Sequence, residues 1–220
     1  MTDAWRETFP NARVGLLVLD DVSNPEAQPL LEHEVRELEV RLREQFAGAD
    51  RSALTALPII QAYQRHYRTF GQTYHVLRQL ESVGLKGKQL ASRGALVLAM
   101  FAAELESLLL TAGHDLDAVQ LPLVLDRSAA GESFVGIGGR EQILRADDML
   151  MRDAAGIISA VIYGPDDRTR LSGTTQRALF TTYAPPGIDI DLVRHHLARL
   201  AELATVVAPA ASIQLLELYP

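Results

Sequence analysis

The sequence predicts a single domain of the α/β class with mixed α+β character, in which helices flank a mixed sheet. Two observations carry this prediction. In the first half of the chain, apolar residues recur at steps of three and four, which is typical of amphipathic helices. The second half instead holds short apolar runs separated by Gly, Asp and Pro, which is typical of strands and turns. Nothing repeats at a fixed period and no low-complexity linker divides residues 1–220, so we expect one domain.

The first half is expected to contain one strand and four helices. Residues 13–20 form an apolar run bounded by turn residues, which predicts a buried strand. A charge-laced helix opens around Pro29, since proline is tolerated in a first turn. Two more helices are predicted over 58–70 and 74–83, each closed by a glycine. The nearly all-apolar segment 92–111 predicts a helix at the centre of the core.

The second half is expected to supply most of the sheet. Its five strand-like runs are 121–127, 132–139, 148–154, 156–164 and 177–184. The sequence Ala-Ala-Gly at 154–156 predicts a tight turn between two of these strands. A last helix over 189–206 and a last strand over 212–218 complete the expected fold.

Composition excludes several classes of protein. The chain has no cysteine, so disulfides and thiolate chemistry are excluded and a reducing cytoplasm is expected. The first ten residues lack the basic start and apolar core of a secretory signal. The apolar run 94–113 contains Glu104 and Glu106, which favours a buried helix over a membrane span, so no membrane partner is expected. The net charge of -7 argues against non-specific coating of nucleic acid.

No motif in the chain predicts a metal or a cofactor. The segment Gly84–Gln89 resembles a phosphate-binding loop, but Gln89 stands where Ser or Thr would hold magnesium. The glycines at 136–139 lack the third glycine and the helix of a dinucleotide site. His195 and His196 are adjacent on a helix and therefore point apart, whereas a metal needs them one turn apart.

Positive charge is concentrated in one part of this acidic chain. Residues 51–103 contain seven Lys or Arg and one acid, a balance of +6, which leaves -13 for the remainder. Tyr67 and Phe70 continue an apolar helical face and are expected in the core. The basic residues left for the surface, and thus for contacts with a phosphate chain, are Arg68, His75, Arg78, Lys86 and Lys88. Such a local patch suits one phosphate chain, and the alternative is a solvated face paired with acids elsewhere.

The order of several short motifs resembles a known family. In chain order they are Tyr67-Arg68-x-Phe70-Gly71, Tyr74-His75-Val76, the apolar helix, Asp115-Leu116-Asp117, Gly131-Glu132-x-Phe134, the glycine-rich step 136–139, Asp147-Asp148, and Arg168-Thr169-Arg170-Leu171-x-x-Thr174. Over residues 60–183 the chain is similar to stand-alone relatives of the editing, or tRNA-binding, domain of the phenylalanyl-tRNA synthetase beta subunit.

The resemblance implies a fold, a reaction and a set of residues. It implies a cleft that holds an amino-acid-like group beside the 3′ end of a tRNA and hydrolyses a wrongly attached ester without metal or cofactor. Glu132 would accept a hydrogen bond from a polar side chain, and Thr174 would orient a water. The substrate-binding residues that the resemblance implies are Gly136, Gly138, Gly139, Arg168, Thr169 and Arg170.

The chain also departs from this family, which leaves three functions open. Relatives carry asparagines before the buried helix and before the Arg-Thr segment, where this chain has Arg93-Gly94 and Ile162-Tyr163. An aminoacyl-tRNA deacylase is the leading prediction. The alternatives are a non-catalytic RNA or aminoacyl-tRNA binder, and a small-molecule enzyme or sensor that reuses the amino-acid pocket.

Overall fold

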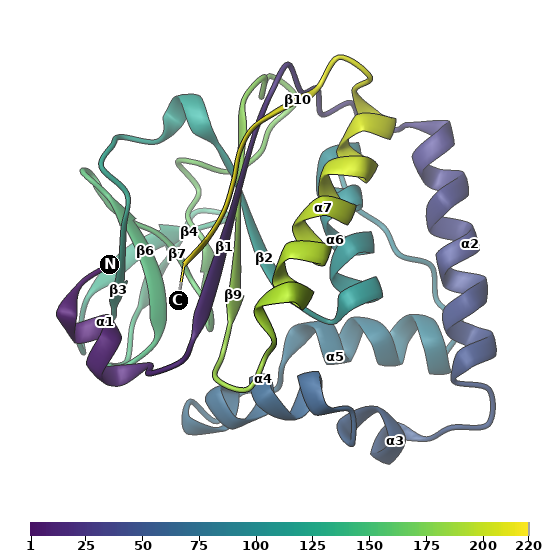
Figure 1. The fold of residues 1–220 in the computed structure, drawn as a ribbon, viewed down its shortest axis with the longest axis horizontal. Helices are drawn as coiled ribbons and strands as arrows, with labels where there is room; N and C mark the ends of the chain where they lie inside the picture. Colours follow the sequence, from purple (N-terminus) through teal and green to yellow (C-terminus); the bar gives the residue numbers. More distant parts are fainter. Residues whose placement is uncertain (220) are drawn as a thin grey trace.

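A four-stranded sheet divides the molecule into a helical side and a strand-rich side (Figure 1). The computed structural model describes residues 1–219. In this sheet β10 (Ser212–Tyr219) pairs with β1 (Arg13–Asp20), β1 pairs with β9 (Ala178–Ala184), and β9 pairs with β2 (Leu110–Asp115). The two central strands are buried along most of their length, because helices cover one face of the sheet and further strands cover the other.

The helical side is built by α2 (Pro29–Gln45), α3 (Arg51–Thr55), α4 (Pro58–Thr69), α5 (His75–Leu80), α6 (Ala95–Ser107) and α7 (Ile190–Val207). Helices α6 and α7 lie next to the sheet, and α2 lies outside them (Figure 1). Prolines occupy the first turns of α2 and α4, as expected for that position. Helix α5 continues into a π-helical turn over Glu81–Leu85, so the helix predicted over 74–83 is present with shifted ends.

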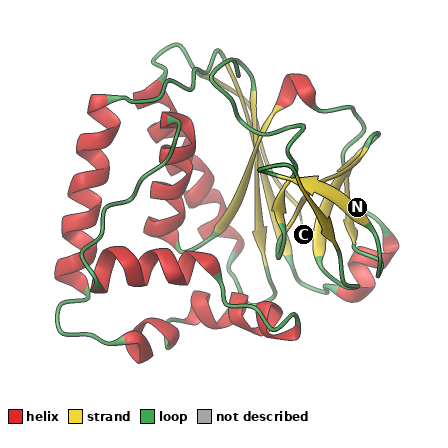
Figure 2. Cartoon of the chain, turned by 180° about the vertical axis from the view of Figure 1, so that it is seen from behind, coloured by secondary structure: helices red, strands yellow, loops and turns green. Residues whose placement is uncertain are grey.

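The strand-rich side contains a second sheet and a hairpin (Figure 2). The second sheet has the order β3 (Val124–Arg127), β6 (Met149–Asp153), β7 (Gly156–Ala160) and β8 (Gly164–Pro165). The hairpin joins β4 (Ser133–Gly136) to β5 (Arg140–Ile143). A short helix α1 (Asp3–Thr8) packs against β3, and a 3-10 turn, Leu116–Ala118, follows β2.

The turn between β6 and β7 confirms the Ala-Ala-Gly prediction and explains it. The carboxylate of Asp153 accepts hydrogen bonds from the backbone N–H groups of Ala155 and Gly156, at 2.9 and 3.1 Å. Gly156 has a φ of 142°, a conformation that side chains with a Cβ rarely adopt. An aspartate followed by a flexible glycine is thus enough to close this hairpin locally.

The α+β class is confirmed, but two details of the expected fold are wrong. Every strand pairing within residues 1–219 is antiparallel, so neither sheet is mixed. The helix expected over 92–111 ends at Ser107, where Leu108 takes a left-handed conformation, and Leu110–Asp115 is a strand. A continuous apolar run does not distinguish a buried helix from a buried strand, so periodicity alone missed this boundary.

One large apolar cluster joins the helices to both sheets. It extends from Trp5 through Tyr63 to Phe180 and Met149, and it contains the buried face of α6, as predicted. Tyr67 and Phe70 are buried, as their helical spacing predicts. A satellite cluster under the hairpin holds Phe134, Leu144, Leu150, Ile157 and Ala160. No helix within residues 1–219 combines the length and the apolar character needed to cross a membrane.

Candidate ligand-binding cavity

A cavity of about 800 Å³ opens where α6, β2, β8 and the segment 170–173 meet. One wall is a stripe of α6 made by Val97, Met100, Phe101 and Glu104. These positions are spaced by three, one and three residues and therefore share one helical face. The opposite face of α6 packs into the core. One wall of the cavity is thus a mostly apolar face of α6.

Glu104 is the one acid that borders the cavity, and it is almost fully buried, with 1% of its surface exposed. Its Oε1 accepts a hydrogen bond from the backbone N–H of Thr111 at 2.8 Å, which ties the end of α6 to the start of β2. Its Oε2 has no hydrogen-bond partner within residues 1–219. Burial raises the pKa of Glu104 to about 8, because an ionised carboxylate is poorly solvated there. The side chain is therefore mainly a neutral acid at pH 7.

A tyrosine–histidine cluster supports another part of the wall. The Tyr67 hydroxyl donates to the backbone oxygen of Val161 at 2.8 Å and lies 3.1 Å from Nδ1 of His75. Burial lowers the pKa of His75 to about 4, so the ring is neutral at pH 7. Since the single phenolic proton is used on Val161, the hydrogen-bond network assigns the ring proton to Nδ1 of His75. Nε2 is then left as an acceptor on a side chain that borders the cavity.

Two arginines border the cavity on its solvent side. Arg93 precedes α6 and is exposed, and no carboxylate within residues 1–219 forms an ion pair with it. Arg170 is also exposed, but its guanidinium pairs with Asp167 at 2.6 Å. The cavity therefore has a cationic mouth, an apolar wall and a buried neutral acid.

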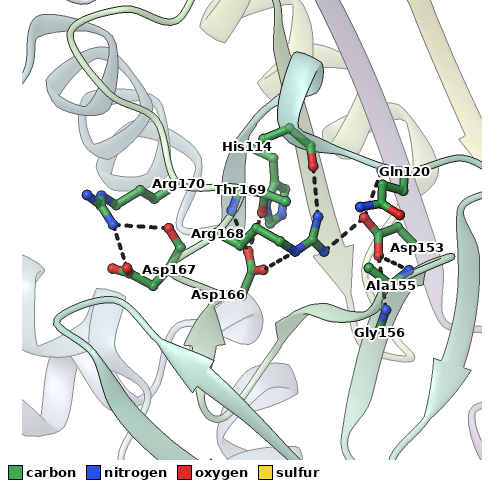
Figure 3. A network of polar contacts seen from close by, with 11 residues as sticks. His114, Gln120, Asp153, Ala155, Gly156, Asp166, Asp167, Arg168, Thr169 and Arg170 are labelled. Carbon is green, nitrogen blue, oxygen red and sulfur yellow. Dashed lines mark hydrogen bonds and ion pairs between the residues drawn. The ribbon is translucent and has the colours of Figure 1, made fainter.

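The segment next to Arg170 forms a polar network that fixes the backbone (Figure 3). Arg168 pairs with the buried carboxylates of Asp153 and Asp166, at 2.9 and 3.6 Å, and donates to a backbone oxygen after β2. Thr169 is fully buried, donates to Asp166 and contacts Nδ1 of His114 at 2.7 Å. Arg168 and Thr169 are thus occupied within the fold, and their neighbour Arg170 borders the cavity.

Comparison with known proteins adds a distant likeness among solved structures. No family model matches the chain, and no curated protein matches it. Among solved structures, it is similar to an N-terminal fragment of the phenylalanyl-tRNA synthetase beta subunit from Pyrococcus horikoshii, with 10% identity and a TM-score of 0.47. The match covers 99% of this chain and 52% of that fragment, so the chain spans about half of its length. A likeness at this level carries no argument about activity.

Glu132 and Thr174, the two residues expected to act in catalysis, do not border the cavity. Both carboxylate oxygens of Glu132 lie 2.9 Å from a guanidinium nitrogen of Arg152, and Glu132 also accepts from the N–H of Ala129. Thr174 is exposed and shares a hydrogen bond with the hydroxyl of Ser172. Glu132 is thus engaged by Arg152 and Thr174 by Ser172, and the catalytic roles of Glu132 and Thr174 stay predictions.

The expected glycines form the tip of the β4–β5 hairpin. Gly138 and Gly139 have φ angles of 92° and 77°, which the tight turn requires. Gly136 ends β4 and pairs with Arg140. None of the three borders the cavity, but Ile137 between them does. The structure thus places this hairpin tip at the cavity and directs an apolar side chain, not a bare backbone, toward it.

Four of the five residues of the expected basic patch are exposed and lie away from the cavity wall, but His75 is partly buried. Arg68, Arg78, Lys86 and Lys88 are exposed and do not border the cavity, whereas His75 does. Lys86 forms an ion pair with Glu81 at 2.7 Å, which agrees with the alternative of a solvated, paired face.

Glu104 and Arg93 are the residues that the sequence reasoning missed as site residues. Glu104 is an acid inside an otherwise apolar helix, and such an acid must find a partner, lose its charge or face a cavity. That signal was present in the sequence, although it could not identify the face on which a cavity would open.

Proposed function

We propose that this protein binds an amino-acid-like carboxylic acid whose apolar or aromatic body enters the cavity beside α6. Its volume of about 800 Å³ falls within the range of small-molecule sites, roughly 300–1,000 Å³. Val97, Met100 and Phe101 offer an apolar surface for the body of the ligand. Arg93 offers a guanidinium for its carboxylate. The observation that carries the proposal is an apolar cavity with an unpaired arginine at its mouth.

Calorimetric titration with phenylalanine and with phenylpropanoate, its analogue without the amine, tests the proposal. Both acids are expected to bind the wild-type protein. Arg93→Gln is expected to weaken binding by at least about tenfold, because a charge-assisted hydrogen bond is lost. Arg140→Gln is the control, since Arg140 is exposed and does not border the cavity. Absence of binding to the wild type, or equal losses in the two variants, would overturn the proposal.

A second candidate is that the acid arrives as an aminoacyl ester on tRNA, which the protein binds or hydrolyses. The supporting observation is a group of exposed cations on α4, on α5 and in the turn after it. Arg68, Arg78 and Lys88 form no ion pair with a carboxylate of residues 1–219. Uncompensated cations of this kind bind phosphates.

Hydrolysis in this second candidate would use a group that the cavity already contains. Water would attack the ester carbonyl, and the ester bond would break to give the free amino acid and the 3′ hydroxyl of the tRNA. Nε2 of His75 is an acceptor for a proton of the attacking water. A positioned group of this kind contributes about 10²–10⁴-fold to such reactions.

Two measurements test the second candidate. A panel of misacylated tRNAs is incubated with the protein, and a shortened ester half-life supports hydrolysis. Lys86→Glu with Lys88→Glu should weaken tRNA binding and flatten its dependence on salt. The charge-matched control is Arg6→Glu with Arg127→Glu, on the strand-rich side of the molecule. Equal tRNA affinity of the lysine variant and the wild type at low salt would leave the free acid as the ligand.

A further inference from the structure

One carboxyl oxygen of Glu104, Oε2, has no role in the binding of the ligand through Arg93. Oε1 is committed to the N–H of Thr111, a contact that holds α6 and β2 together. Glu104 borders the cavity, and its Oε2 is buried and has no hydrogen-bond partner among the described residues. A buried polar atom without a partner destabilises a folded protein, so an unpartnered oxygen on a residue that borders a cavity points to a ligand group that satisfies it.

The positions of Glu104 and Arg93 indicate how a ligand would be oriented in the cavity. Arg93 and Arg170 border the cavity and are exposed, whereas Glu104 borders it with only 1% of its surface exposed. A ligand whose carboxylate meets Arg93 therefore extends its other end toward Glu104. Between these two ends lie apolar side chains of α6, which offer no further hydrogen bond to the ligand.

We infer that Glu104 determines ligand specificity: its protonated carboxyl donates a hydrogen bond from Oε2 to an acceptor group at the buried end of the ligand. The inference rests on the proposed function, because it requires an acid bound through Arg93. It assigns the ligand class more narrowly, as an aryl or alkyl carboxylic acid that carries an ether, carbonyl or hydroxyl oxygen at the end remote from its carboxylate. Acids that lack this oxygen leave Glu104 unsatisfied and bind more weakly.

The chemistry of the surroundings favours a donor over an anion at this position. Burial raises the pKa of Glu104 to about 8, and the hydrogen bond from Thr111 is the one contact that opposes this shift. No cation within residues 1–219 forms an ion pair with Glu104. The titratable and charged groups that face Glu104 or share its cavity are Tyr63, Tyr67, Tyr74 and His75 on the α4–α5 side, Arg93 before α6, Tyr163 and Arg170 around β8, and Tyr183 on β9.

Three of these tyrosines, on α4 and just before α5, do not replace Glu104 as the donor. Tyr63, Tyr67 and Tyr74 each donate their proton to a backbone oxygen, of Tyr183, Val161 and Leu108 respectively. Burial raises the pKa of all three tyrosines, so they remain neutral over the range in which Glu104 titrates. A change in ligand affinity near pH 8 in these conditions therefore reports on Glu104.

The test compares phenylpropanoate with its para-methoxy derivative, whose ether oxygen only accepts hydrogen bonds. Neither acid titrates between pH 6 and pH 10, so a pH effect belongs to the protein. At pH 6 the methoxy acid is expected to bind the wild type about tenfold more tightly than phenylpropanoate, the value of one neutral hydrogen bond. Above the pKa of Glu104, which burial raises to about 8, that preference is expected to disappear.

Two variants separate hydrogen bonding from packing. Glu104→Gln retains an acceptor for Thr111 and a donor for the ligand but cannot ionise, so its preference for the methoxy acid is expected to persist from pH 6 to pH 9. Glu104→Leu removes the donor, and its preference is expected to vanish at every pH. Thermal unfolding of both variants at pH 6 verifies that they are folded before affinities are compared.

The outcomes distinguish failure of the inference from failure of the proposed function. If neither acid binds the wild type at any pH, the proposed function fails, and the inference fails with it. If both acids bind and Arg93→Gln weakens them, but the methoxy preference is absent or independent of pH, the proposed function stands and the role of Glu104 is refuted. A preference that Glu104→Leu retains refutes that role as well.

Discussion

The pH dependence of stability is the most direct test of a buried neutral acid in α6. In the unfolded chain Glu104 ionises near its ordinary pKa of 4.5, whereas burial raises the pKa in the folded protein to about 8. Between these values the folded protein holds one proton more than the unfolded chain. Its free energy of unfolding therefore falls as pH rises, by about 1.36 kcal/mol per pH unit. Over about 3.5 pH units the loss reaches about 5 kcal/mol.

Glu104→Gln removes this titration and keeps the acceptor for the N–H of Thr111. The contribution of Glu104 is fully present below pH 4.5, and it is lost as pH rises through about 8. The free energy of unfolding of the variant minus that of the wild type is therefore expected to increase by about 4 kcal/mol between pH 5 and pH 8. The buried histidines make the free energy of unfolding change with pH in the opposite direction. Both proteins contain them, so their contribution cancels when the two free energies are subtracted.

Urea unfolding of the two proteins at pH 5, 6, 7, 8 and 9 measures this difference. Glu44→Gln is the matched control, because it removes an exposed carboxylate from the surface of α2. The difference in the free energy of unfolding between Glu44→Gln and the wild type is expected to change far less over the same pH range. If the difference in the free energy of unfolding between Glu104→Gln and the wild type does not change with pH, Glu104 is ionised in the folded protein at pH 7. That result would refute a buried neutral acid at the cavity.

Three further predictions follow from other buried contacts. Burial lowers the pKa of His114 to about 3 and of His196 to about 4, so each neutral ring stabilises the fold above pH 6.5 and that contribution is lost as pH falls. Between pH 6.5 and pH 4 the free energy of unfolding of a His196→Gln variant, measured by urea unfolding, should therefore fall by about 1.36 kcal/mol less per pH unit than that of the wild type. Arg168→Gln leaves two buried carboxylates unpaired and should cost about 2 kcal/mol of stability without weakening ligand binding; a large loss of affinity in a protein of unchanged melting temperature would contradict this. Gly94→Ala places a Cβ within 2.5 Å of the Asn24 side chain and should destabilise the protein by about 1–3 kcal/mol in thermal unfolding, whereas an unchanged melting temperature would show that Asn24 moves freely.

The secondary structure could be predicted from the sequence wherever a local signal was complete. The helix that starts at Pro29 and the turn after Asp153 depend on periodicity and on the conformational preferences of Pro and Gly, which act within a few residues. The boundary at Ser107 was missed, because it depends on a left-handed residue and on a carboxylate that contacts the next strand. Neither feature changes the apolar pattern of the run.

The order of the strands and the composition of the cavity were decided by the tertiary structure. Strand β1 pairs with β9 and β10, which lie far along the chain, and no local pattern specifies such partners. The same packing brings His75, Arg93 and Arg170 to one cavity and leaves Glu132 in an ion pair with Arg152. By itself the sequence determined most of the helices and strands and that an acid lies within an apolar helix. Only the packing decided which face of α6 stays uncovered, because a cavity is the space that remains after all the elements have packed.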